Sequence, residues 1–115
     1  MPNQLPDLDD VFQALAHPAR RHVVRRLSAG TAGVSELAKP FDMALPSFLQ
    51  HLEVLEDCGL VDSEKVGRVR RYRLTPEPLR AARGWLREQQ AVWERRLDQL
   101  DDYLLDLKRQ QENDR

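Results

Sequence analysis

The last third of the chain carries an apolar pattern that a long helix satisfies. Large apolar side chains follow one another at alternating spacings of four and three residues, at Trp93, Leu97, Leu100, Leu104 and Leu107. This is the spacing of a coiled-coil seam, and it predicts a helix over residues 76–111, about 54 Å long at ~1.5 Å per residue. A small domain offers no internal partner for the whole of such a stripe. The pattern therefore predicts a homodimer that forms through this helix.

Length and composition favour one small folded domain over residues 1–115. The chain has 115 residues, of which 41% are hydrophobic, so a core is possible, although a partner that covers further apolar surface would add stability. No apolar run approaches the ~20 residues that cross a bilayer, and residues 1–10 show no signal-peptide pattern. We therefore expect a cytoplasmic protein with no membrane partner.

Four shorter helices are predicted ahead of the long one, over residues 7–16, 18–29, 34–39 and 44–58. The first has apolar side chains at helical spacing, and we expect Leu8, Val11 and Phe12 to add to the dimer interface. The third and fourth are short and joined by a tight connection. Residues 34–58 therefore form a candidate helix-turn-helix.

Two extended segments follow, over residues 61–66 and 69–74, around a Gly67-Arg68 turn. Tyr72 and Leu74 alternate with arginines, so one face of a hairpin can be buried while the other is basic. A two-stranded hairpin alone is only marginally stable, so residues 61–74 must lean on the helices as a wing. The predicted fold class is mainly α with a small β wing, a winged helix-turn-helix with a long C-terminal dimerisation helix.

Positive charge is concentrated in this wing and just after it. The net charge of the chain is −1, yet residues 61–83 hold seven basic side chains against three acidic ones. In winged helix-turn-helix proteins the hairpin reaches along the DNA backbone, so the wing charge falls where phosphate is expected. The alternative is a solvated, charged hairpin with no partner. The predicted phosphate contacts are Lys65, Arg68, Arg70 and Arg71.

The helix over 44–58 would enter the major groove. Gln50 is the best candidate for base readout, because a glutamine side chain pairs well with adenine. Ser47 and His51 lie on or beside the same face and are expected near DNA, although a structural role for His51 is equally consistent with the pattern. Leu45 and Leu49 fall at the edge of the inward face, which favours packing over contact with thymine methyl groups.

Enzymatic chemistry is not indicated. The chain lacks a glycine-rich phosphate loop and a nucleophile motif, and its three histidines are scattered. The single cysteine, Cys58, is interpreted as a small buried apolar residue; a redox switch would need an exposed thiol of low pKa.

Three segments resemble the ArsR/SmtB family of bacterial winged-helix repressors: "ALAHPARRHVVRRL" (14–27), "VSELAKPFDMALPSFLQHLEVLEDCGLV" (34–61) and "GRVRRYRL" (67–74). The pattern S-x-x-x-H-L-x-x-L-x-x-x-G-L-V over 47–61 is the most specific part. The resemblance implies a dimeric repressor of a palindromic operator in double-stranded DNA, with the first and last helices at the dimer interface. Many members of the family release DNA when a metal or another signal binds.

The chain departs from the metal-sensing members of that family. The helix before the recognition helix lacks their paired cysteines, and residues 85–108 contain no histidine, so neither familiar zinc site has its ligands. We therefore expect no metal and no cofactor, and leave open an unknown small-molecule or protein effector. Trp85 and Trp93 belong to the core or dimer interface, or else line an aromatic pocket for such a ligand.

A second hypothesis comes from a different class of protein. A helical dimer that binds another protein, without specific DNA recognition, would also have the long amphipathic helix. The apolar Leu45 and Leu49 on the recognition helix support this hypothesis, and the concentrated charge of the wing argues against it.

Overall fold

The structure is a computed structural model, and it describes residues 7–114. Its contacts divide the chain into two units, one that ends at Ala82 and one that begins at Arg83, and each is described by itself. The elements of the first unit are α1 (Leu8–Leu15), α2 (Pro18–Leu27), β1 (Ala32–Gly33), α3 (Val34–Ala38), α4 (Leu45–Asp57), β2 (Val61–Val66), β3 (Val69–Leu74) and the start of α5 (Pro76–Asn113).

The first two helices begin at side-chain caps. The Asp7 carboxylate accepts a hydrogen bond from the backbone N–H of Asp9 at 2.9 Å and so caps α1. The Nδ1 atom of His17 accepts from the N–H of Ala19 at 3.1 Å, and Pro18 occupies the first turn of α2, where its missing N–H costs nothing. Both helix starts therefore follow from local chemistry.

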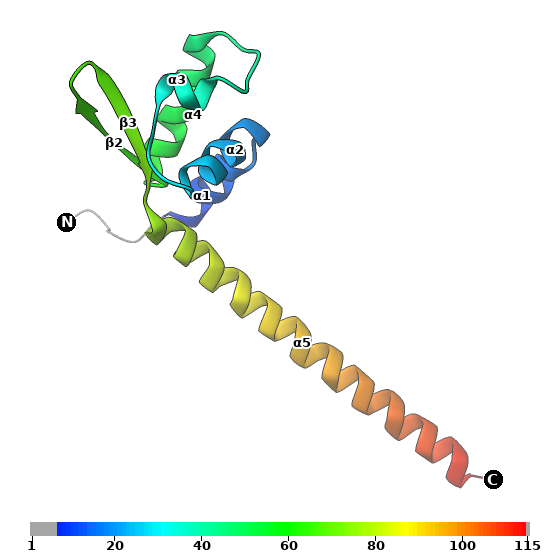
Figure 1. Cartoon of the computed structure of the whole chain (residues 1–115). Helices are drawn as coiled ribbons and strands as arrows, with labels where there is room; N and C mark the ends of the chain where they lie inside the picture. Colours follow the sequence, from blue (N-terminus) through cyan, green and yellow to red (C-terminus); the bar gives the residue numbers. More distant parts are fainter. Residues whose placement is uncertain (1–6, 115) are drawn as a thin grey trace. The chain divides into compact units, whose positions relative to one another are not determined.

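The sheet has three antiparallel strands in the order β1-β3-β2, and Figure 1 shows the hairpin of β2 and β3. The hairpin of β2 and β3 pairs Val61 with Leu74 at its base and Val66 with Val69 beside the turn. Gly67 has a φ of 65°, in the left-handed region that glycine adopts without strain. The predicted two-stranded wing thus gains a third strand, because β1 pairs with β3 on the side away from β2.

Gly33 explains how β1 can lie so close to the wing. A Cβ atom added at Gly33 would meet the Cγ1 atom of Val69 at 3.1 Å. Gly33 and Arg71 are directly paired across the two strands. A side chain at position 33 would therefore require the side chain of Val69 to move by a few tenths of an ångström.

One hydrophobic core holds the first unit together. Its largest fully buried side chains come from α1, α2, α3, α4 and the base of the wing: Phe48, Leu37, Leu52, Leu55, Leu60, Val11, Val23 and Val61. Ala82 and Tyr72 belong to the same cluster. The core thus fixes the helix-turn-helix and the wing in one body.

The second unit is a single helical segment, the part of α5 from Arg83 onward. The apolar side chains of the predicted seam are exposed, from 38% at Leu107 to 62% at Trp93. The guanidinium of Arg96 lies 6.0 Å from the centre of the Trp93 ring. No helix among residues 7–114 is both long enough and apolar enough to span a membrane.

Candidate nucleic-acid interface

The recognition helix α4 presents one face to the core and the other to solvent. Phe48, Leu52 and Leu55 are buried to 1% exposure or less, and they recur at the spacing of a helix face. Pro46 lies in the first turn, and Gly59, with a φ of 82°, follows the C-cap Cys58. The helix is therefore held along its length with its opposite face free.

Ser47 and Gln50 lie on that free face, and both are exposed. Leu45 and Leu49 are 53% and 40% exposed, so the interpretation that they pack in the core is wrong for this unit. Phe48, Leu52 and Leu55 already fill the inward face. Two apolar side chains thus stand beside the candidate base-reading glutamine.

His51 has a structural partner. A guanidinium is always a donor, so the Nη1 atom of Arg20 donates to the Nδ1 atom of His51 at 3.1 Å. The ring of His51 also lies 4.2 Å from that of His17, centre to centre. Burial, then the neighbouring His17, then Arg20 lower the pKa of His51. The structure thus ties this side chain of α4 to α2.

Arg20 and Arg21 also bind the end of α1, a role that no sequence pattern predicted. The Nε and Nη2 atoms of Arg20 donate to the carbonyl oxygens of Ala14 and Gln13 at 2.6 and 3.0 Å. Arg21 donates to the carbonyl of Leu15 at 2.8 Å. These carbonyls lie in the last turn of α1, beyond most of the helical N–H groups; that of Gln13 also accepts from the N–H of Ala16 at 3.1 Å. The two arginines therefore fasten α1 to α2.

The wing brings its predicted cations to one hairpin but uses them differently. Lys65 and Arg70 are cross-strand partners, and Arg68 lies in the turn. Lys65, Arg68 and Arg70 are exposed, while Arg71 is half-buried. Within residues 7–114, the side chain of neither Lys65 nor Arg68 forms a hydrogen bond or an ion pair. These two cations are free to meet a phosphate.

The other wing arginines have partners inside the chain. Arg70 donates to the hydroxyl of Ser63 at 2.9 Å, and that hydroxyl donates to a carboxylate oxygen of Glu56 in α4 at 3.0 Å. Arg73 pairs with Asp62 at 2.8 Å, and this hydrogen bond is the main cause that holds the pKa of Asp62 below its usual value. Acidic side chains therefore restrain part of the positive charge of the wing.

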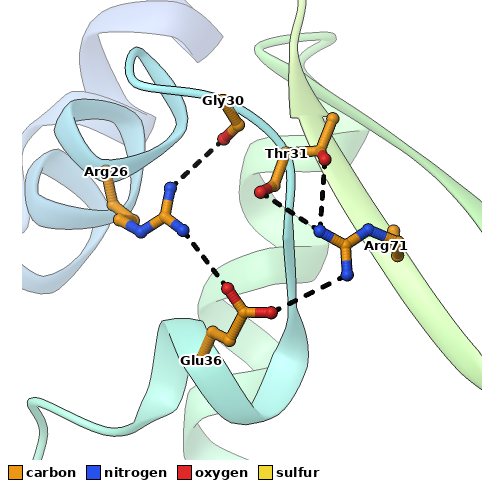
Figure 2. A network of polar contacts seen from close by, with 5 residues as sticks. All are labelled: Arg26, Gly30, Thr31, Glu36 and Arg71. Atoms are coloured by element: carbon orange, nitrogen blue, oxygen red, sulfur yellow. Dashed lines mark hydrogen bonds and ion pairs between the residues drawn. The ribbon is translucent and has the colours of Figure 1, made fainter.

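Arg71 belongs to a network that joins the wing to α2 and α3 (Figure 2). Its Nη2 atom donates to the carbonyl and hydroxyl oxygens of Thr31 at 3.3 and 3.2 Å, and its Nη1 atom lies 3.7 Å from Oε1 of Glu36. Arg26 donates to Oε2 of Glu36 at 3.2 Å and to the carbonyl of Gly30 at 3.3 Å. Arg71 is therefore not the free cation that its place in the wing predicted. The pairing of β1 with β3 brings this network together. Sequence patterns do not predict a strand of only two residues.

The candidate dimer residues fall into two groups. Val11 is 0% exposed and belongs to the core, so its assignment to the interface is corrected: α1 turns this side chain inward. Leu8 and Phe12 are half-buried against the same core. In the second unit, half or more of each remaining side chain is exposed except at Leu107: Trp93, Leu97, Leu100 and Leu104.

Cys58 is partly buried at the C-cap of α4. Its thiol donates to the carbonyl of Leu55 at 3.4 Å, and burial raises its pKa. A raised pKa leaves less of the reactive thiolate at neutral pH. An open hollow of about 390 Å³ between α1, α2 and α4 includes this thiol and the carboxylates of Asp10 and Asp57. No group of three or more potential metal ligands gathers anywhere in residues 7–114.

Two comparisons with relatives place the chain among regulators. A protein-family model described as a helix-turn-helix domain matches residues 15–64. The HTH-type transcriptional regulator Rv2034 of Mycobacterium tuberculosis is 41% identical over 75 residues, which cover 65% of this chain and 70% of the relative. The transcriptional repressor SdpR of Bacillus subtilis is 25% identical over 79 residues, covering 69% of this chain and 88% of the repressor.

Solved structures agree in fold. The crystal structure of an ArsR family transcriptional regulator is 57% identical, covers 76% of this chain and 90% of its own, and has a TM-score of 0.73. The homodimeric winged helix-turn-helix DNA-binding domain of a possible ArsR-family regulator from Mycobacterium bovis is 26% identical, covers 78% of this chain and 81% of its own, and has a TM-score of 0.57. With its winged helix-turn-helix and its likeness to these regulators, the chain belongs to the ArsR family of transcriptional regulators.

Proposed function

We propose that this protein is a homodimeric repressor that binds a palindromic operator in double-stranded DNA. The observation that carries the proposal is the position of α4: its inner face is locked into the core, while its outer face stands exposed in the same rigid unit as a wing with two unpaired cations. This arrangement suits a helix in the major groove and a hairpin along the backbone.

Gln50 and Ser47 are the proposed groups for contact with bases and nearby backbone. Leu45 and Leu49 suit the methyl group of thymine, which is an apolar feature of the major groove. Lys65 and Arg68 are the proposed phosphate contacts, and Arg70 and Arg71 could join them by exchanging their internal partners. His51 is proposed to support α4 through Arg20 rather than to read a base.

Replacement of Gln50 tests base readout. We expect Gln50→Ala to change the preference at one or two operator positions, with a loss of about 1–3 kcal/mol of discrimination there. Binding to operators with single base-pair changes, measured by competition, gives this directly. Gln89→Ala, at an exposed glutamine of α5, is the control and should leave the preference pattern unchanged. An identical pattern for wild type and Gln50→Ala would remove Gln50 from the readout.

The exposed stripe of α5 supports the proposed dimer. Leu97, Leu100 and Leu104 have about half of their surface in water, and burying apolar surface contributes roughly 25 cal/mol per Å². The spacing of these leucines matches a helix that packs against another helix. A second copy of α5 supplies such a partner, and a dimer presents two recognition helices to the two halves of a palindrome.

A protein-interaction module remains the second candidate, favoured by the exposed Leu45 and Leu49. In that case α4 would bind an apolar groove of another protein instead of DNA. We propose no catalytic activity, metal or cofactor, a location in the cytoplasm where DNA is accessible, and an effector of unknown chemistry.

The deciding experiment is fluorescence anisotropy with the duplex upstream of this protein's own gene and with a scrambled duplex of the same composition. Measurements at several salt concentrations give the number of phosphate contacts from the slope of log K against log salt. A preference for the native duplex at one dimer per site supports the proposal. Equal, weak binding to both duplexes, repeated with duplexes tiled across the neighbouring genes, would move the protein-interaction hypothesis to the front.

A further inference from the structure

Glu36 is an acidic side chain in a place where the proposed function calls for positive charge. It lines a groove of about 520 Å³ between the start of α3 and the wing, together with Ser35, Arg68 and Arg70. A DNA strand that follows the wing cations would pass this groove with its phosphates near Glu36. A lone carboxylate there would repel the strand.

The carboxylate is held by two arginines from opposite sides (Figure 2). Oε2 lies 3.2 Å from Arg26 of α2, and Oε1 lies 3.7 Å from Arg71 of β3. The longer contact is the one to the wing. The three side chains are 38%, 37% and 52% exposed for Arg26, Arg71 and Glu36, so solvent, and equally a phosphate, can reach the network.

Arg71 is anchored on one nitrogen and weakly engaged on the other. Its Nη2 atom keeps two hydrogen bonds to Thr31, while only Nη1 faces Glu36. Exposed ion pairs contribute little to stability, whereas guanidinium–phosphate contacts are charge-assisted and often bidentate. Exchange of Glu36 for a phosphate at Nη1 is therefore favourable once DNA is present. After the exchange, Arg26 would still neutralise Glu36, and the hydrogen bond from Arg26 to the carbonyl of Gly30 would keep its guanidinium in place.

We propose that Glu36 competes with DNA phosphate for Arg71. In the free protein the Glu36 carboxylate pairs with Arg71, and a phosphate of the strand that enters the groove replaces it. This inference rests on the proposed DNA-binding function. It adds that Glu36 lowers the affinity of the protein for all DNA. Any duplex must displace Glu36 from Arg71 before a phosphate can bind there, so the competition lowers the affinity for operator and random DNA alike.

The test is Glu36→Gln, which keeps the shape and hydrogen-bonding capacity of the side chain and removes its charge. We expect about fivefold tighter binding to the scrambled duplex, since an exposed ion pair is a weak competitor, and a salt slope steeper by about 0.9 for one added phosphate per protomer. Binding to the operator should tighten by a similar factor, because the released Nη1 atom contacts phosphate in either duplex. Circular dichroism melts of each variant establish that it is folded at the assay temperature.

Two further variants distinguish competition for Arg71 from the general electrostatic effect of removing a negative charge. Glu64→Gln removes a charge from an exposed wing position directly opposite Arg71 in the register of β2 and β3, where Glu64 forms no ion pair within residues 7–114. It therefore reports the electrostatic effect of a nearby carboxylate without the contact and should give less gain. Arg71→Ala should abolish the extra gain of Glu36→Gln in the double variant. These differences form a double-mutant cycle.

Several outcomes would overturn the inference. Weaker binding by Glu36→Gln would mean that Glu36 positions Arg71 for DNA. A gain equal to that of Glu64→Gln, or one that persists with Arg71→Ala, would mean that no specific competition exists. If wild type binds scrambled DNA without preferring any operator, the proposed sequence-specific function fails while the Glu36→Gln cycle still decides the role of Glu36. If wild type and Glu36→Gln both bind no duplex at low salt, both proposals fail.

Discussion

The two units of the chain differ in how far their apolar side chains are buried. In the first unit Phe48, Leu52 and Leu55 are almost completely buried by other parts of the same chain. In the second unit Leu97, Leu100 and Leu104 are spaced as regularly along a helix, yet about half of each side chain remains in water. The apolar side chains of the first unit are buried within one chain, whereas those of the second unit become buried only when another chain packs against them.

This difference separates two kinds of stability. Unfolding of the first unit should not depend on protein concentration, because its core is internal. Stability that arises from α5 should rise with concentration, because association acts by mass action. Substitutions in the two units should therefore differ in kind as well as in size.

The largest effect is expected from the core. Phe48→Ala should lower the free energy of unfolding by about 3–5 kcal/mol, because Phe48 is fully buried and leaves a cavity that its neighbours fill only in part. Chemical denaturation followed by circular dichroism measures this loss. A loss below about 1 kcal/mol, far less than such cavities cost, would show that α4 is not held by this side chain.

The seam of α5 should respond in a different way. Leu100→Asp is expected to convert dimers to monomers and to weaken operator binding by about a hundredfold or more, because two linked half-site contacts become independent. Sedimentation velocity and anisotropy measure the two effects. Leu105→Asp is the matched control, since Leu105 is equally exposed but lies off the seam; a dimer that survives Leu100→Asp, or is lost equally with Leu105→Asp, would refute the interface.

The wing should contribute a smaller effect that is uniform across sequences. Lys65→Ala with Arg68→Ala should weaken binding to operator and scrambled DNA alike and reduce the salt slope by about 0.9 for each phosphate that is no longer bound. Arg73→Ala should change the slope less, because Arg73 is already paired with Asp62. Equal slopes for wild type and the double variant would contradict the wing assignment.

The smallest effect concerns pH and His51. Since the pKa of His51 is lowered in the fold, the unfolded chain binds more protons between the two pKa values. The contribution of His51 to stability is therefore fully present above the unfolded pKa and is lost as pH falls below it. Denaturation between pH 7 and 5 should show a smaller decline for His51→Asn, which keeps an acceptor for Arg20 without titrating. His17 faces the same ring, so the difference between the two proteins, not the total decline, is the measurement.

Much of the fold followed from local patterns. The strands over 61–66 and 69–74 have the predicted bounds, because β-branched residues and the Gly67 turn mark both ends. The helices begin and end within two residues of expectation, since Pro18, Pro46 and Gly59 are strong local signals. β1 was missed because two residues, Ala32 and Gly33, carry no periodicity.

The candidate site was less accessible to sequence reasoning. The faces of α4 followed from helical spacing, but the exposure of Leu45 and Leu49 depends on how completely three other side chains fill the core. The state of each arginine depended on tertiary neighbours: Arg71 meets Glu36 only because β1 brings α3 to the wing. Charge composition located the wing, and only the structure separated its paired cations from its free ones.

The strand order β1-β3-β2 also bears on how the protein behaves when crowded. The regular strand β3 lies in the middle of the sheet, where β2 pairs along its whole length on one side and β1 pairs with Arg71 and Tyr72 on the other. β1 is only two residues long, and the outer strand β2 carries Asp62, Glu64 and Lys65. Short and charged edge strands resist the edge-to-edge pairing that leads to aggregation. The same small sheet that supports the wing therefore offers another polypeptide little edge on which to add a strand.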